Sequence, residues 1–224
     1  MALPILETPQ FETSLPSDNK KVVYRPFTVK EQKNLMIAQT GGNEKEAIKA
    51  LAQCLNMCVI GENIAIEKRP IVDFEWLFLQ VRGKSVGEVA ELSSSCIECG
   101  AIFDFEFDLK NVTIPKLPNN KIKVNNDLVI EFDYVSLNDI IKSNEQNDIV
   151  SECARTIFYK NETYTEFTKE EFLKFIEPLT LAEYEPIDNY FKIQPGLRLE
   201  TKQKCFKCGH TNDVAMEGVF NFFQ

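Results

Sequence analysis

Two cysteine motifs of the same form constrain this chain more than any other feature of its sequence. The first, CIECG, begins at Cys96, and the second, CFKCG, begins at Cys205. Two thiolates three positions apart can chelate one ion across a tight turn, and the glycine that follows, Gly100 or Gly209, supplies a permissive backbone. A structural zinc ion takes four ligands in a tetrahedron, so each motif supplies half of a site. The two motifs therefore predict one shared site.

The predicted ligands are the four thiolates of the two motifs, Cys96, Cys99, Cys205 and Cys208, and the predicted cofactor is one structural Zn²⁺ per chain. Two alternatives are a pair of unlinked reduced dithiols and two separate redox centres. Neither motif opens a helix in a βαβ unit, as a redox C-x-x-C does. The only histidine, His210, follows the second motif and could replace a cysteine, although four thiolates make it unnecessary.

The spacing of the motifs predicts the topology. An ordinary zinc ribbon has about 15–20 residues between its cysteine pairs, whereas residues 100–204 separate the pairs here. We expect a zinc-ribbon-like unit with hairpins at 88–109 and 197–223, into which a β–α segment (about 110–196) is inserted. Residues 101–109, AIFDFEFDL, alternate apolar and acidic side chains, as an antiparallel strand with one buried face does.

Helical periodicity surrounds these strands and completes an α+β fold class. Helices are expected at 28–39, from an Asn43 N-cap to a Gly61 stop, and from Asp73 to Arg82 with Gly83 in the left-handed C′ position. A further helix is expected at 145–158. Two capping boxes, Thr168-x-x-Glu171 and Thr180-x-x-Glu183, predict two more helices, and Pro186 should kink or shorten the second.

Residues 1–27 contain four prolines and predict an extended arm, because proline fixes φ and biases its predecessor toward extended backbone. The arm either lies on this protein's own surface or wraps a neighbouring subunit. The predicted division is then the arm (1–27), a helical region (28–83) and the split ribbon (84–224). The remaining cysteines, Cys54, Cys58 and Cys153, lie in apolar stretches and are expected in the core.

Composition excludes several classes of function. The net charge is −9, which argues against phosphate-backbone binding and in favour of protein partners. No apolar run approaches the roughly 20 residues of a membrane span, and the N-terminal residues lack the pattern of a secretory signal, so we expect intracellular synthesis. One histidine and no phosphate-binding loop leave no catalytic constellation or small-molecule site to nominate.

Two classes remain on the residues alone. One is a non-enzymatic interaction or assembly protein. The alternative is a zinc-ribbon accessory factor for a nucleic-acid machine. The lysines around the second motif, Lys202, Lys204 and Lys207, favour this alternative. Acidic residues on the first hairpin argue against that alternative.

Several stretches resemble the baseplate hub proteins of T4-like contractile-tailed bacteriophages. They are residues 3–38, AIKALAQCLNMCVIG at 47–61, and DFEWLFLQVRGKSVGEVAEL at 73–92 followed by CIECG. The resemblance covers roughly the first 110 residues, and its most specific parts are YRPF-x-V-K-E and FLQVRGKSVGE.

This resemblance implies a protein of tail assembly, either a hub subunit or a factor that builds the hub, with other tail and baseplate hub proteins as partners. Its location is then the host cytoplasm during assembly, with the virion tail baseplate as a second location. We expect partner contacts at the arm-to-helix junction and at the end of the third helix. The residues proposed for these contacts are Tyr24, Arg25, Pro26, Phe27, Trp76, Arg82, Lys84 and Ser85.

Overall fold

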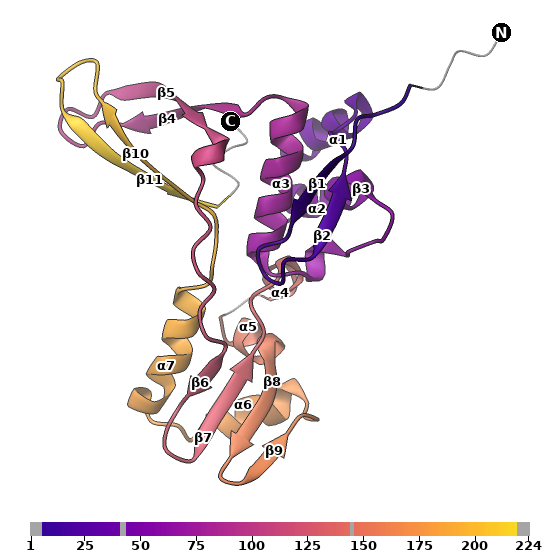
Figure 1. The fold of residues 1–224 in the computed structure, drawn as a ribbon. Helices are drawn as coiled ribbons and strands as arrows, with labels where there is room; N and C mark the ends of the chain where they lie inside the picture. Colours follow the sequence, from indigo (N-terminus) through magenta and orange to yellow (C-terminus); the bar gives the residue numbers. More distant parts are fainter. Residues whose placement is uncertain (1–5, 41–43, 144–145, 219–224) are drawn as a thin grey trace. The chain divides into compact units, whose positions relative to one another are not determined.

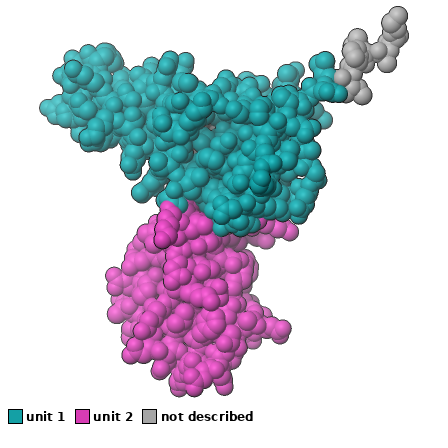
Figure 2. All heavy atoms as spheres, viewed as in Figure 1, with its two compact units in different colours: residues 1–66, 72–115, 196–224 teal, residues 67–71, 116–195 magenta. Residues whose placement is uncertain are grey.

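The computed structural model describes residues 6–40, 44–143 and 146–218. Within these residues the chain is a mixture of helices and antiparallel sheets, as the predicted α+β class requires (Figure 1). It divides into two compact units. Unit 1 comprises residues 1–66, 72–115 and 196–224, and unit 2 comprises residues 67–71 and 116–195 (Figure 2).

Unit 1 combines helices with two kinds of antiparallel sheet. A three-stranded sheet has the order β1-β2-β3, and two separate two-stranded sheets are β4-β5 and β10-β11. The elements are β1 (Phe11–Ser14), β2 (Lys21–Tyr24), α1 (Val29–Thr40), α2 (Glu44–Cys58), β3 (Val59–Ile60), α3 (Ile71–Ser85), β4 (Val89–Ser95), β5 (Ile102–Asp108), β10 (Arg198–Lys204) and β11 (Thr211–Glu217). There are also two short 3₁₀ turns among the described residues, Leu109–Asn111 in unit 1 and Ile66–Lys68, of which only Ile66 belongs to unit 1.

The N-terminal segment folds as a hairpin on the core of unit 1. Strand β1 pairs with β2 from Phe11↔Tyr24 to Ser14↔Lys21, and Leu15 and Tyr24 are 0% and 1% exposed. The turn between the strands is held to α3, because the backbone N–H of Ser17 donates to the Asp73 carboxylate at 2.9 Å. This packing supports the first of the two explanations for the proline-containing segment, in which it lies on its own protein.

The helices of unit 1 lie at the predicted positions, with two errors at their C-terminal ends. Helix α2 ends at Cys58 and does not continue to Gly61, because Val59 and Ile60 pair with β2 as strand β3. Helix α3 runs past Gly83 to Ser85, and Val86 N–H still donates to Arg82 C=O at 2.9 Å. The positive φ falls instead at Gly87, at 130°. The prediction that Gly83 ends the helix was therefore wrong, because the last turn gains a partner outside it: Phe27 N–H donates to Ser85 Oγ at 2.8 Å. Asn43, the predicted N-cap, lies outside the described residues.

The alternating pattern predicted for the strands is present in the two C-x-x-C hairpins. Strands β4 and β5 pair antiparallel over seven residues each, and the phenylalanines of β5 are buried on one face. Strands β10 and β11 pair in the same way, from Arg198↔Glu217 to Lys204↔Thr211. Each hairpin loop carries one cysteine motif, so the two motifs occupy equivalent places in two similar hairpins.

Unit 2 is a four-stranded antiparallel sheet with helices packed on it. The sheet order is β6-β7-β8-β9, and in Figure 1 α6 lies behind β7 and β8. The elements are β6 (Lys121–Lys123), β7 (Leu128–Phe132), α4 (Leu137–Lys142), α5 (Gln146–Cys153), β8 (Ala154–Tyr159), β9 (Glu162–Tyr164), α6 (Lys169–Ile176) and α7 (Leu181–Lys192). The core contains Phe132, whose ring contacts Phe172, Tyr190 and Phe191.

Both predicted capping boxes of unit 2 are present, on α6 and α7. The helix predicted at 145–158 is wrong in its second half: α5 ends at Cys153 and β8 begins at Ala154. Residues 156–159 are β-branched or aromatic, and pairing with β7 places them in the sheet. Helix α7 is not shortened at Pro186, since buried Ile187 and Tyr190 anchor the turn that follows.

Among the described residues, no helix combines the length and the apolar character that crossing a bilayer requires.

Candidate metal centre

Each cysteine motif forms a tight turn closed by backbone hydrogen bonds. In the first, Cys96 N–H donates to Ala101 C=O and Gly100 N–H donates to Cys96 C=O, both at 2.9 Å. The second motif repeats these bonds at 2.8 and 3.0 Å. The glycines have φ values of 67° at Gly100 and 75° at Gly209, in the left-handed region that favours glycine. The sequence C-x-x-C-G thus builds the same turn twice.

The two turns bring the four predicted ligands together. All four sulfur atoms lie within 4.8 Å of one another, with Cys96 Sγ 3.6 Å from Cys208 Sγ and Cys99 Sγ 3.7 Å from Cys205 Sγ. A tetrahedral zinc ion with Zn–S bonds of about 2.3 Å holds its sulfurs about 3.8 Å apart. The spacing and chemistry of this donor set fit a four-thiolate metal site.

The surroundings of the thiols favour a partly ionised cluster. Burial opposes ionisation of Cys96, but the backbone N–H groups of Cys99 and Glu98 outweigh it, and the pKa of the Cys96 thiol falls to about 6. At Cys208 the backbone N–H of His210 lowers the pKa of the thiol, whereas desolvation and hydrogen bonds with the neighbouring sulfurs raise it. The raising effects prevail, and the pKa of Cys208 is about 12. The Cys208 thiol therefore keeps its proton at neutral pH, and a divalent cation that binds there would displace it.

One residue that the sequence reasoning missed connects the two motifs. Asn212 is 2% exposed, and its Oδ1 accepts from Ile97 N–H at 3.0 Å across the two hairpins. Its Nδ2 donates to the carbonyl groups of Gln203 and His210 at 3.5 and 3.4 Å. No local pattern distinguishes this asparagine from an ordinary turn residue, because its role depends on a contact between residues over 100 positions apart.

The group of potential ligand atoms around this centre consists of the four cysteines and does not include His210. The histidine contributes its backbone instead, since its carbonyl accepts the Cys205 N–H. The other three cysteines, Cys54, Cys58 and Cys153, are buried as predicted, with exposures of 2%, 0% and 0%.

The structure places the predicted arm-to-helix contact residues inside unit 1. Tyr24 is buried, and its ring packs against that of Phe11 in a tilted arrangement, with 5.8 Å between ring centroids. Arg25 donates to the carboxylate of Glu31 through both guanidinium nitrogens, at 2.8 and 2.6 Å, and to the carbonyl of Pro26 at 3.0 Å. This network fixes the entry into α1.

The residues predicted at the end of the third helix lie beside a small cavity. Trp76 and Lys84 line a space of about 260 Å³ together with Glu88 and Lys110, and Trp76 Nε1 donates to a threonine of β1 at 2.9 Å. Lys84 and Lys110 both form ion pairs with Glu88. Arg82 donates to the carbonyl of Gly87 at 3.4 Å. The Phe27–Ser85 hydrogen bond joins this cavity region to the arm-to-helix junction.

The fold and the cysteine site define an α+β protein with two hairpins that meet at a four-cysteine centre. A family model described as "T4 bacteriophage base plate protein" matches residues 8–224, and the chain belongs to this family. The match confirms the resemblance found in the first 110 residues and extends it to the end of the chain. A search of curated proteins and a search of solved structures gave no match. Family membership supports a structural protein of the phage tail baseplate whose partners are other tail or baseplate proteins.

Proposed function

We propose that this chain is a non-enzymatic component of the baseplate hub, or a factor that assembles the hub, and that it acts through protein–protein contacts. The observation that carries this proposal is the family match over residues 8–224. The residue-level resemblance at YRPF-x-V-K-E and FLQVRGKSVGE directs it toward the hub. Assembly in the host cytoplasm follows, with the virion tail baseplate as the site of the finished protein.

The four cysteines hold one structural zinc ion in this proposal. The ligands are Cys96 and Cys99 from the loop of β4–β5 and Cys205 and Cys208 from the loop of β10–β11. The ion would supply four metal–thiolate bonds between hairpins that are far apart in the sequence. An isolated two-stranded hairpin is marginally stable in water. The metal–thiolate bonds would therefore stabilise each hairpin by fixing it to the other. The split-ribbon division, with an insert at about 110–196, belongs to the same proposal.

Partner contact is proposed at the end of α3. The cavity lined by Trp76 and Lys84 offers an aromatic side chain next to charged ones, the combination that is enriched where interfaces have their strongest contacts. Arg82 and Ser85 support this surface from the last turn of the helix. The residues Tyr24–Phe27 hold it in place, because Phe27 donates to Ser85.

Co-expression with the other baseplate proteins of the same phage tests the proposal. We expect the full-length chain to co-purify with at least one hub protein, and Lys84→Glu to weaken that complex more than Lys116→Glu, a charge reversal outside the proposed surface. Retention on DNA that falls with salt, without any bound tail protein, would instead support the accessory factor for a nucleic-acid machine. The exposed acidic residues of β5, Asp104 and Glu106, argue against that outcome.

A further inference from the structure

Strand β9 leaves one edge of the unit 2 sheet open. It pairs with β8, and among the described residues no strand pairs with its other side. The β8–β9 loop has two residues, with Lys160 at a φ of 55°, and Tyr159↔Glu162 is the closing pair. In such a hairpin the closing residues exchange their hydrogen bonds, so the next residue, Thr163, directs its backbone N–H and C=O away from β8. All of β9 is exposed to solvent.

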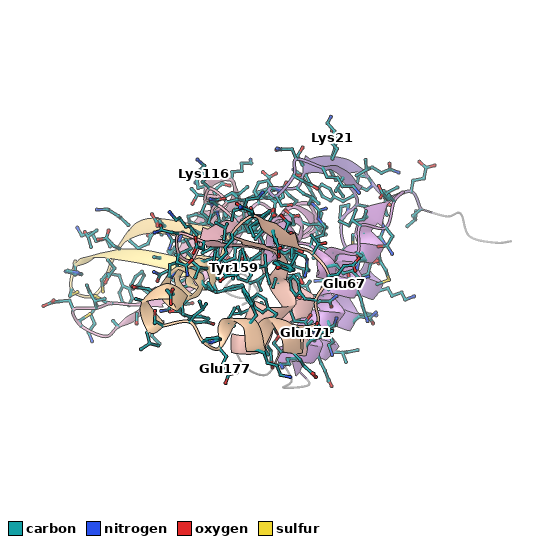
Figure 3. The ribbon with its side chains drawn as sticks, turned by 90° about the horizontal axis from the view of Figure 1, so that it is seen from below. Lys21, Glu67, Lys116, Tyr159, Glu171 and Glu177 are labelled. Atoms are coloured by element: carbon teal, nitrogen blue, oxygen red, sulfur yellow. The ribbon has the colours of Figure 1, made fainter. Side chains whose placement is uncertain are left out.

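An aromatic groove lies between this open edge and α6, and we call it the β9 groove. Its volume is about 400 Å³. Tyr159 and Tyr164 are 37% and 43% exposed, the Tyr159 ring meets Phe175 edge to face at 6.2 Å, and Phe167 stacks on Phe172 at 5.8 Å. Figure 3 labels Tyr159 on β8 and Glu171 on α6. The apolar lining consists of Ile157, Tyr159, Tyr164, Phe167, Phe172 and Phe175.

The charged residues that line the β9 groove are acidic. The charged residues that line it are Glu166 and Glu171, and exposed Glu162 adds a third carboxylate from β9, where it accepts from the Tyr164 hydroxyl. The Lys160 ammonium group lies 5.2 Å from the centroid of the Tyr159 ring, so this tyrosine is already in cation–π contact with a positive charge. The groove is therefore suited to aromatic or aliphatic groups that are accompanied by positive charge.

We propose that the β9 groove binds an extended segment of a partner protein that carries a large apolar side chain next to lysine or arginine. The segment adds to β9 as a fifth strand, using the outward N–H and C=O of Thr163. Its apolar side chain enters the groove between β9 and α6, and its basic side chains meet Glu162, Glu166 and Glu171. Strand addition of this kind takes affinity from main-chain hydrogen bonds and specificity from pockets for alternate side chains. The origin of the segment in another baseplate protein rests on the proposed function.

A peptide array tests this proposal. Overlapping 15-residue peptides that cover the baseplate proteins of the same phage, and this chain itself, are probed with the full-length protein, and the strongest binder is measured by fluorescence anisotropy. We expect that binder to alternate apolar and basic residues. Replacing its lysines and arginines with glutamate should weaken binding at least about tenfold, as unpaired like charges at an interface do.

Two variants and a control locate the binding. Thr163→Pro removes the outward N–H at a position where an edge strand tolerates proline, and Tyr164→Ala removes one wall of the groove. Both should weaken binding by about tenfold or more, while Thr163→Ala, which keeps the N–H, should change it less than about twofold. Circular dichroism confirms that each variant is folded.

The proposal would be overturned if no peptide binds, if acidic peptides bind best, or if both variants bind as tightly as the wild type. A best binder from this chain itself would also overturn it, because the occupant would then be a second copy or a segment of the same molecule. The proposed function is tested separately by co-purification of whole proteins. If co-purification persists when no peptide binds, the groove is wrong and the hub function stands. If peptides bind while no hub protein co-purifies, the β9 groove proposal stands and the hub function is wrong.

Discussion

The paired hairpins of unit 1 and the sheet of unit 2 are stabilised in different ways. The hairpins are two-stranded sheets whose loops converge on four cysteines. Unit 2 has four strands and a continuous core in which Phe132, Phe172 and Ile187 are completely buried. Burial of such side chains contributes about 1.5–3 kcal/mol each. The hairpins also bury apolar side chains, among them Leu92, Phe103 and Leu199, but each is a sheet of only two strands, which is marginally stable by itself. We therefore expect the hairpins to depend on the proposed ion, whereas unit 2 depends on its own core.

Loss of the metal has the largest expected effect. Cys99→Ser and Cys208→Ser each remove one ligand, from the first and the second motif respectively. Structural zinc supplies about 10–16 kcal/mol in peptide models, so we expect either variant to lose the ion and open both hairpins. Metal analysis should find about one zinc per wild-type chain, and hydrogen exchange should increase in residues 89–108 and 198–217 of the variants without a comparable increase in unit 2.

Cys54→Ala is the matched control for this prediction, because Cys54 is a buried cysteine outside the metal centre. It should keep the zinc. A wild-type chain that holds no zinc when purified without chelators, or a loss confined to one of the two serine variants, would contradict a site shared by both motifs.

The second prediction concerns a substitution that should destabilise unit 2 and leave the metal centre intact. Phe132→Ala removes a ring that is 0% exposed and in contact with three aromatic side chains, and large-to-small changes of this kind cost about 3–5 kcal/mol. Denaturant unfolding and hydrogen exchange should show the loss in unit 2, while metal analysis still finds one zinc per chain. Leu181→Ala, at a side chain that is 90% exposed, should change stability by less than about 0.5 kcal/mol. Zinc loss in the Phe132→Ala variant would show that the two regions are not independently stabilised.

The third prediction concerns the contact that joins the two motifs. Asn212→Ala leaves the Ile97 N–H without its acceptor, and the loss of a typical intramolecular hydrogen bond costs about 0.5–1.5 kcal/mol. Because Ile97 follows the ligand Cys96, zinc release to a competing chelator should also become easier, by about tenfold or more. Asn119→Ala, an exposed asparagine of unit 2, serves as the control. If Asn212→Ala and the wild type release zinc to the chelator equally readily, Asn212 does not help to hold the metal centre.

The sequence predicted those parts of the fold that short segments determine. A C-x-x-C-G turn and the Thr168 and Thr180 capping boxes are closed by hydrogen bonds within a few residues, so their patterns are sufficient. The end of α3 at Ser85 and the change from α5 to β8 depend on partners elsewhere in the chain. Asn212 depends on such a distant partner as well. For this reason the clustered cysteines could be predicted from the sequence, whereas the residue that connects their two loops could not.

The smallest expected effect is a pH dependence in unit 2. The carboxylate of Glu183 accepts from Thr180 N–H at 3.0 Å, from Asn125 at 2.9 Å and from the Thr180 hydroxyl at 2.8 Å, and these donors lower its pKa below the usual value of 4.5. A group whose pKa falls on folding stabilises the folded state above its unfolded pKa, and this contribution disappears as the pH drops through the folded pKa. Glu183→Gln keeps an acceptor and removes the titration. The wild type should therefore be more stable than the variant at neutral pH, and the difference should shrink below about pH 4.5 when denaturant unfolding of unit 2 is followed by hydrogen exchange. Zinc content should be the same in both proteins at neutral pH, because this carboxylate contributes to the core-dependent region alone; a pH-independent difference would mean that the glutamine disturbs the cap itself.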